Sequence, residues 1–386
     1  MNQSGFDMSI VERITTPFYY YDMDLLQATL DQINHLTAGL PCCVHYALKA
    51  NSNAHIISKI SSSGLGCDLV SGGEIKAALK AGFLPQQMTF SGVGKTDWEI
   101  ELGLSHEIGC FNVESVPELD IINQLAGTMG KTARVALRVN PDIDAHTHKF
   151  ITTGTANDKF GISIESLPLV VKHARHLSNI HLRGLHFHIG SQITSMQPYV
   201  DLCKVINNLL DHFHQSGIDF EMINVGGGLG IDYLHPDTNA IPDFKTYFKT
   251  FGEHLKLRPN QMLHFELGRS IVGQCGTLIA RVVFVKETCG KKFVILDAGM
   301  TDLIRPALYG AYHEIQNLRS SGGPTETYDI VGPVCESTDV FARARQLPVT
   351  SRGDIIAIRS AGAYGESMAS RYNMRPLPGC IFSSET

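Results

Sequence analysis

The sequence predicts an α/β protein: a TIM-type (β/α)8 barrel joined to an all-β domain of the sandwich or Greek-key barrel kind. Between about residues 40 and 270, eight short, apolar, β-branched runs alternate with helix-like stretches. Such runs are typical of parallel strands that are buried on both faces, and eight strand–helix alternations indicate a barrel. After Arg269, short strand patterns separated by Gly- and Pro-containing turns indicate the second, β-rich domain.

The predicted elements follow the chain in order. The barrel strands are expected at Val44–Ala47, Cys67–Val70, Met88–Ser91, Cys110–Val113, Val135–Val139, Gly184–His188, Met222–Val225 and Leu263–Glu266. Helices are expected at Gly73–Ala81, Ser163–Leu177, Pro198–Gln215 and Phe244–Leu255. Strands of the β domain are expected at Val282–Val285, Phe293–Leu296, Tyr328–Val331 and Ile355–Arg359.

The segment Pro17–Asp22, which contains three consecutive tyrosines, precedes the barrel but has a strand pattern. We expect it to pair into the second domain. The predicted boundaries are therefore 25–270 for the barrel, and 1–24 together with 271–386 for the β domain.

Composition limits the classes of function. The chain has 386 residues, 43% hydrophobic and 18% charged, with a net charge of -6, which argues against a nucleic-acid partner. The low charged fraction leaves surface for burial against another subunit. No apolar run reaches the length of a membrane span, and Met1–Ile14 lacks the apolar region of a secretory signal. Nine cysteines without a C-x-x-C pair argue against structural zinc and disulfides, and favour the cytoplasm.

Polar residues gather where the predicted strands end, which is where TIM barrels carry their catalytic groups. Lys49 follows the first strand. A desolvated lysine has a lowered pKa and can act as a nucleophile, although a lysine at such a position can also extend to solvent. Asp68 ends the second strand, and Glu74 follows in the first turn of the next helix.

The sixth strand carries His186 and His188 on one face. They could bind a metal, stack on a ring, or be satisfied core histidines. The seventh strand leads into Gly226–Gly230, and the eighth ends in Glu266 followed closely by Arg269. The loops after these two strands commonly hold a phosphate in TIM barrels. A lysine, a phosphate cradle and an acid for a pyridinium nitrogen are the recurring parts of a pyridoxal-phosphate site.

With these residues the chain resembles the fold-type III pyridoxal-phosphate-dependent decarboxylases, which join a TIM barrel to a β-sandwich domain. Within them it is similar to the enzymes that act on diaminopimelate. The matching segments span nearly the whole chain: Tyr46–Asn51, Asp68 to Glu74, Lys159–Gly161, His188–Ser191, Gly226–Gly228, Cys335–Ser337 and Gly362–Gly365. Leu267 stands where that family usually has proline.

The resemblance implies a role for each matching residue. Lys49 would bond to the cofactor, His188 would stack on its ring, and Glu266 would hold the pyridine nitrogen protonated. The full set implied for cofactor binding is Lys49, Asp68, His188, Ser191, Gly227, Gly228, Glu266, Gly268, Arg269 and Tyr364. No metal-binding residues are expected.

Cys335 would donate the proton that replaces the lost carboxylate, a task suited to a thiol because its ordinary pKa of about 8.5 is close to the working pH. In the family this loop reaches the partner's active site, which implies a homodimer with shared sites. The substrate residues implied are Arg269, Arg305, Tyr309, Glu336 and Tyr364. Arginines suit the distal carboxylate of diaminopimelate, and Glu336 suits its ammonium group. The implied reaction converts meso-2,6-diaminopimelate to L-lysine and CO2, the last step of lysine biosynthesis.

Three other functions remain open at this point. A decarboxylase of the same fold could act on ornithine, arginine or carboxynorspermidine. A metal-dependent hydrolase could use His186, His188 and Asp68. A non-catalytic regulatory relative is opposed by the presence of both Lys49 and Cys335.

Overall fold

A computed structural model describes residues 11–143, 159–319 and 322–383. The contacts divide the chain into two compact units. The barrel unit comprises Leu30–Gly230 and Asp243–Gly268. The β-rich unit comprises Met1–Thr29, Ile231–Pro242 and Arg269–Thr386. Residues 1–10, which we expected in the β domain, lie outside the described part of the chain.

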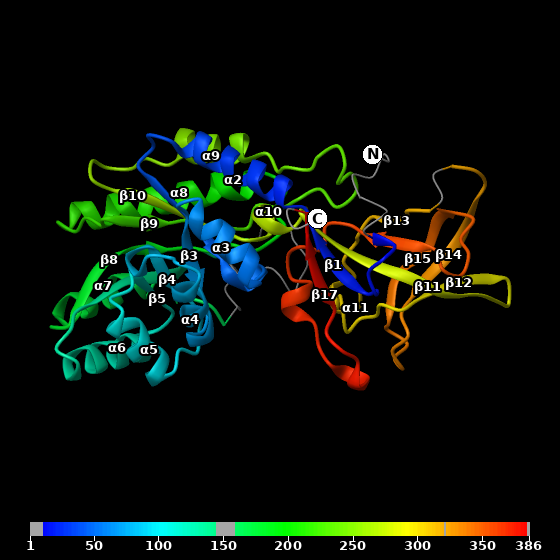
Figure 1. Ribbon diagram of the computed structural model, residues 1–386. Coiled ribbons are helices and arrows are strands. Elements are labelled where there is room, and N and C mark those ends of the chain that lie inside the picture. Colours follow the sequence, from blue (N-terminus) through cyan, green and yellow to red (C-terminus); the bar gives the residue numbers. More distant parts are fainter. Residues whose placement is uncertain (1–10, 144–158, 320–321, 384–386) are drawn as a thin grey trace. The chain divides into compact units, whose positions relative to one another are not determined.

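The barrel unit contains a closed ring of eight parallel strands (Figure 1). The strand order is β5-β4-β3-β2-β10-β9-β8-β6, and β5 pairs with β6 to close the ring. The strands are β2 (Cys42–Ala47), β3 (Gly66–Leu69), β4 (Met88–Phe90), β5 (Cys110–Val113), β6 (Ala133–Asn140), β8 (Ile180–His186), β9 (Met222–Asn224) and β10 (Met262–Leu267). A short strand, β7 (Ile162–Ser163), adds to β6. The predicted barrel is confirmed.

Helices alternate with these strands and lie outside the ring in Figure 1. They are α2 (Met23–Thr37), α3 (Ala54–Ser62), α4 (Gly72–Lys80), α5 (Asp97–Ser105), α6 (Val116–Thr128), α7 (Leu167–His176), α8 (Gln197–Gln215) and α9 (Phe244–His254). Side-chain caps begin several of them: Ser71 and Ser115 each accept a hydrogen bond from the third amide of their helix. Within the described residues, no helix is long and apolar enough to cross a bilayer.

The interior of the barrel is unusually polar for a core. Six of its buried residues, contributed by six different strands, carry polar or charged groups: Asp68, Asn112, Arg138, His186, Asn224 and Glu266. Burying such groups is costly unless they are hydrogen-bonded to one another. A set of this kind on strands that converge in a barrel indicates a functional site.

The β-rich unit contains an eight-stranded, mostly antiparallel sheet with the path β13-β16-β11-β12-β14-β15. Off this path, β1 pairs with β11, and β17 pairs with β1. Its strands are β1 (Phe18–Tyr21), β11 (Gly276–Thr288), β12 (Lys291–Leu296), β13 (Ile315–Asn317), β14 (Thr325–Val331), β15 (Val340–Pro348), β16 (Ile355–Ile358) and β17 (Gly379–Phe382). The predicted N-terminal strand does pair here, with β11 and β17. The predicted fold class is therefore confirmed.

Three of these strands, β13, β15 and β17, were absent from the prediction. Strand β15 lies at the end of the sheet path and carries the exposed Arg343 and half-buried Arg345. Charges on an edge strand protect it from pairing with other chains, but they also hide the apolar alternation that identifies a strand. The short helices α10 (Arg269–Val272) and α11 (Arg305–Tyr309) interrupt the otherwise β-rich unit.

Candidate active site

Lys49 lies in the turn that follows strand β2. The 3-10 turn Leu48–Ala50 continues directly from the strand, and the Lys49 side chain is 37% exposed. Its Nζ lies 3.4 Å from Oδ2 of the fully buried Asp68. Burial and the nearby Glu266 raise the pKa of Asp68, while Lys49 opposes this shift. The ammonium group is thus held beside a buried acid, while part of the lysine side chain is exposed to solvent.

Glu266 is buried near the end of β10 and is surrounded by hydrogen-bond donors. His186 Nε2 lies 3.0 Å from its Oε2, and the amides of Asn112 and Asn224 donate to its Oε1 at 2.9 and 2.6 Å. Burial by itself raises the pKa of Glu266. The charge and hydrogen bond of His186, and then the charge of Lys49, outweigh burial and hold this pKa well below its usual range. Glu266 is therefore a buried carboxylate that stays ionised.

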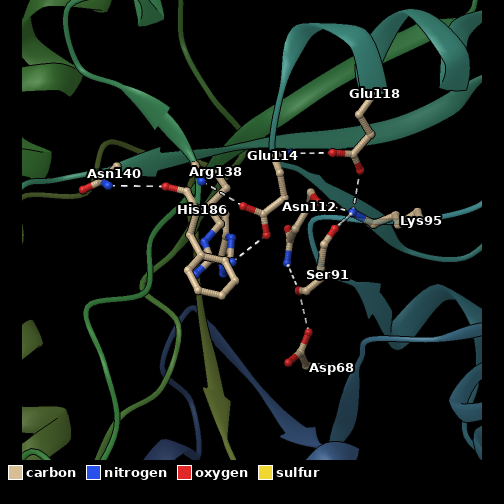
Figure 2. A network of polar contacts seen from close by, with 12 residues as sticks. Asp68, Ser91, Lys95, Asn112, Glu114, Glu118, Arg138, Asn140 and His186 are labelled. Carbon is tan, nitrogen blue, oxygen red and sulfur yellow. Dashed lines mark hydrogen bonds and ion pairs between the residues drawn. The ribbon is translucent and has the colours of Figure 1, made fainter. Parts of the chain in front are cut away.

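A hydrogen-bonded path joins the lysine end of the barrel to Glu266. Ser91 donates to Asp68 Oδ1 at 2.7 Å, and Asn112 donates to Ser91 Oγ at 2.9 Å (Figure 2). The same Asn112 amide donates to Glu266. This path fixes both acids relative to each other, as a rigid site requires.

A second buried ion pair explains the Lys159–Gly161 motif. Arg138 NH1 lies 2.5 Å from Glu114 Oε1, and the amide of Gly161 donates to the other Glu114 oxygen at 2.9 Å. The Arg138 guanidinium also lies over the Phe160 ring, 4.5 Å from its centroid. Gly161 has φ +77, and an added Cβ would lie 3.0 Å from the Asn140 amide nitrogen, so this position favours glycine.

The loops after β8 and β9 meet beside Glu266. The amide of Gly227 donates to His188 Nδ1 at 3.3 Å. Burial, together with the charges of Lys49 and Arg138, holds the pKa of His188 well below its usual value. Because its Nδ1 accepts the hydrogen bond from Gly227, the ring is neutral. A Cβ at Gly227 would lie only 1.8 Å from the Glu266 carbonyl oxygen. Only glycine therefore lets this loop approach β10 so closely. Ser191 is half-buried in the loop after His188.

Two other expected residues lie at the end of β10. Leu267 is fully buried and pairs with Tyr46 of β2, so the strand ladder itself fixes the position where the family usually has proline. Gly268 follows, and an added Cβ there would lie 3.0 Å from the Ala50 Cβ. The glycine thus lets β10 pack against the turn that carries Lys49.

In the β-rich unit, Arg269 begins α10 and is only 6% exposed. Its NH1 donates to the hydroxyl of Tyr233 at 2.7 Å, and its guanidinium lies over the Tyr364 ring at 5.0 Å. The structure therefore brings Arg269 and Tyr364 together, as expected for residues of one site. Tyr233 was not predicted.

Arg305 begins α11, which ends at the half-buried Tyr309. Arg305 is 5% exposed, and its guanidinium lies over the Tyr233 ring at 4.9 Å. Its NH1 lies 2.9 Å from His313 Nε2. Burial first, and then the charge of Arg269, lower the pKa of Arg305, while Tyr233 opposes this effect.

Cys335 and Glu336 lie in an exposed loop of the β-rich unit. The amide of Cys335 donates to the Asn373 side chain at 3.1 Å, and Tyr372 donates to Glu336 Oε1 at 2.6 Å. Glu336 therefore pairs with Tyr372, not with Arg305. The exposure of Cys335 excludes the alternative that this thiol is a core residue.

Several residues of the network were not predicted as site residues: Ser91, Asn112, Asn224, Tyr233 and His313. The signal for two of them was present, since Asn112 and Asn224 interrupt apolar strand runs at positions that become buried.

No group of three or more potential metal ligands occurs in the described part of the chain, and His186 and Asp68 are engaged with Glu266, Lys49 and Ser91. These contacts weaken the hydrolase alternative.

The residues of the barrel fit a pyridine ring cofactor. An ionised carboxylate offers about four lone-pair directions, and three donors among the described residues bind Glu266, so one direction remains for a protonated ring nitrogen. The site combines that carboxylate with a partly exposed lysine and with the glycine loop after β9. A lysine, an acid for the ring nitrogen and a loop that can hold a phosphate are the recurring parts of a pyridoxal-phosphate site.

Comparison with known proteins supports this class. Residues 25–273 match the family model described as pyridoxal-dependent decarboxylase, pyridoxal binding domain. The barrel and its lysine–carboxylate site therefore define a pyridoxal-phosphate-dependent decarboxylase. A diaminopimelate decarboxylase of Bacteroides thetaiotaomicron is 57% identical over 373 residues, which are 96% of this chain and 96% of the relative. The one from Aquifex aeolicus is 40% identical and covers 95% of this chain and 86% of its own length.

Solved structures agree with the sequence comparison. A crystal structure of diaminopimelate decarboxylase from Helicobacter pylori, complexed with L-lysine, superposes with a TM-score of 0.92. It is 38% identical and covers 98% of this chain and 94% of that one. The chain belongs to the diaminopimelate decarboxylase family, which confirms the resemblance found in the sequence.

Proposed function

We propose that this protein decarboxylates meso-2,6-diaminopimelate to L-lysine and CO2, the last step of lysine biosynthesis. The observation that carries the proposal is the buried Arg305, whose described partners are the phenol of Tyr233 and the imidazole of His313, with no carboxylate among them. A desolvated cation without a compensating anion is suited to a ligand carboxylate. Diaminopimelate has such a group at its distal end, whereas ornithine presents only an ammonium group there.

We propose that the domain predicted at residues 25–270, which contains the barrel unit Leu30–Gly230 and Asp243–Gly268, is the cofactor-binding domain. Lys49 would bond to the cofactor and His188 would stack on its ring. Ser191, Gly227, Gly228, Gly268 and Arg269 would hold its phosphate. Asp68 and Tyr364 would complete the cofactor contacts. Arg269, Arg305, Tyr309, Glu336 and Tyr364 would bind the substrate.

When bound, pyridoxal phosphate supplies an electron sink for the bonding pair that the departing carboxylate leaves behind. The protein's own groups do the remaining work. Glu266 would place a negative charge at the ring nitrogen, because its donors hold it ionised even though it is buried. Asp68 orients the Lys49 ammonium group. Cys335 would deliver a proton from its Sγ to the carbon that has lost CO2.

We further propose a homodimer in which the Cys335 loop completes the site of the partner subunit. The exposure of Cys335 and Glu336 in one chain supports this, because a proton donor must be excluded from bulk water when it acts. A cytoplasmic location is supported by nine cysteines that are all free thiols.

The reaction is tested with the purified protein and added pyridoxal phosphate. Absorbance spectra are recorded before and after adding meso-diaminopimelate, and CO2 release is compared for diaminopimelate, ornithine, arginine and carboxynorspermidine. Release from diaminopimelate with formation of L-lysine is expected. Preferential release from any of the other three would refute the substrate assignment.

The shared site is tested by complementation. Lys49→Ala and Cys335→Ala chains, each inactive alone, are mixed under dissociating conditions and reassociated. A mixed dimer should regain activity, because one of its two sites receives both a native lysine and a native cysteine. Activity that stays at the level of the single variants would contradict sharing.

A further inference from the structure

The arginine pair of the β-rich unit is held by two aromatic residues that the family motifs did not single out. Tyr233 accepts a hydrogen bond from Arg269 NH1 at 2.7 Å, and its ring lies 4.9 Å from the Arg305 guanidinium. His313 packs edge-on against the same tyrosine, with 5.1 Å between ring centroids, and is 3% exposed. Two guanidinium groups and a histidine are thus buried together.

The hydrogen bonds define the protonation state of His313. A guanidinium can only donate, so His313 Nε2, 2.9 Å from Arg305 NH1, must be the acceptor. His313 Nδ1 lies 2.8 Å from the carbonyl oxygen of Arg359, which can only accept, so Nδ1 carries the hydrogen. The ring is therefore the neutral Nδ1–H form. Burial, and then the charge of Arg305, lower the pKa of His313 to about 3.

A neutral partner leaves the charge of Arg305 intact. A carboxylate at this position would form an ion pair and cancel that charge before any ligand arrived. Arg305 Nε is also buried and has no hydrogen-bond partner within the described residues. An arginine presents Nε and NH2 along one edge, which matches the two oxygens of a carboxylate. Because His313 occupies NH1 and Tyr233 also hydrogen-bonds to the guanidinium, the buried Nε is the position left for a ligand oxygen.

We propose that His313 is a positioning residue that sets the specificity of Arg305 for a carboxylate: it fixes the guanidinium through NH1, keeps its charge uncompensated and leaves Nε to the ligand. The ligand end is a carboxylate attached to a flexible aliphatic chain. The inference rests on the proposed function, in which this carboxylate is the distal one of diaminopimelate, and it goes further by assigning a residue outside the substrate contacts.

The test compares His313→Gln, His313→Leu and His313→Glu in the full-length enzyme with cofactor. Gln keeps a neutral acceptor for Arg305 and a donor for the Arg359 carbonyl, so KM for meso-diaminopimelate should stay within about threefold of the wild type. Leu removes the acceptor, and KM and the inhibition constant of L-lysine should rise together by roughly 10- to 100-fold, the scale of a lost hydrogen bond to a charged group. The kcat value should change far less.

The Glu variant keeps an acceptor but neutralises Arg305, so its KM should rise at least as much as that of the Leu variant even if it folds better. His235→Leu, at an exposed position of the same unit, is the matched control and should leave KM unchanged. If the Glu variant binds substrate as the wild type does, or if the Gln variant is as impaired as the Leu variant, the positioning role is wrong.

A separate measurement distinguishes this inference from the proposed function. Imidazole 15N NMR, with the His313 signal assigned by its loss in His313→Gln, should show the neutral Nδ1–H form between pH 5 and 8. An imidazolium or the Nε2–H form would overturn the inference even if diaminopimelate is turned over. A wild-type enzyme that releases no CO2 from diaminopimelate would instead refute the proposed function, whatever the NMR result.

Discussion

The Nζ atom of Lys49 lies 3.4 Å from Oδ2 of Asp68, an acid that is fully buried. Asp68 in turn is connected through Ser91 and Asn112 to Glu266. One hydrogen-bonded path therefore connects the amine that would carry the cofactor with the carboxylate that would hold its ring nitrogen.

Lys49→Ala should lower kcat by at least about a thousandfold, on the scale usual for a residue that bonds to the reacting group. Borohydride treatment of the wild type should attach a pyridoxyl group to the peptide that contains Lys49, as read by mass spectrometry. Lys80→Ala, at an exposed position of α4, is the control and should retain activity. Labelling of another lysine would show that Lys49 has been misassigned.

Glu266→Gln should lower kcat by at least about a hundredfold, the lower end of what a lost charge at the reacting centre costs. An amide offers one acceptor oxygen to the three donors that now bind Glu266, and it cannot hold a ring nitrogen protonated. Glu253→Gln, on the exposed surface of α9, is the matched control. Retention of full activity would contradict the role of Glu266.

The free energy of unfolding of Glu266→Gln, compared with that of the wild type, should depend on pH. The pKa of Glu266 is lower in the folded protein than the usual value of about 4.3, so the folded state favours the ionised form. This contribution is complete well above that usual value, begins to fall near pH 5 and is lost progressively as the pH falls further. The difference in unfolding free energy between wild type and Glu266→Gln should therefore shrink as the pH is lowered below about 5. A difference that grows with acidity in urea titrations would be incompatible with an ionised Glu266.

Cys335→Ala should lower kcat strongly and leave thermal stability nearly unchanged. The side chain is exposed, so its loss creates no cavity, unlike the cost of several kcal/mol that is usual in a core. Cofactor absorbance should also be unaffected. Cys289→Ala, the other exposed cysteine in the described residues, is the control and should be fully active. A large fall in melting temperature would favour a structural role.

Arg305→Ala should lower kcat/KM for meso-diaminopimelate by roughly 30- to several-thousand-fold, corresponding to about 2–5 kcal/mol for one member of a desolvated charge pair. Inhibition by L-lysine should weaken in parallel, because the product presents its own carboxylate to the same arginine. Ornithine and cadaverine, which offer an ammonium group there, should bind no worse than before. Equal losses for all four ligands would indicate that Arg305 organises the fold instead.

The barrel and much of the candidate site could be predicted from sequence because both depend on local patterns. Buried parallel strands produce short apolar runs, and the carboxyl ends of such strands converge whatever the loops contain. Lys49, Asp68 and Glu266 therefore stood out by their place at or next to strand ends. Strand β15 could not be recognised, because it lies at the edge of its sheet and carries arginines that interrupt the apolar alternation of a strand.

Only the tertiary structure determined which groups meet. Asn112 and Glu266 are 154 residues apart, and no local pattern pairs them; the closed ring brings their strands to the same interior. Tyr233 lies in the segment Ile231–Pro242, between two stretches of the barrel unit, yet makes its described contacts in the β-rich unit with Arg269, Arg305 and His313. The sequence by itself determined most of the helices and strands and the reactive residues at their ends, because these depend on neighbours along the chain. The protonation state of Glu266 and the contact of Arg305 with Tyr233 depend on partners from distant segments, so only the folded chain decides them.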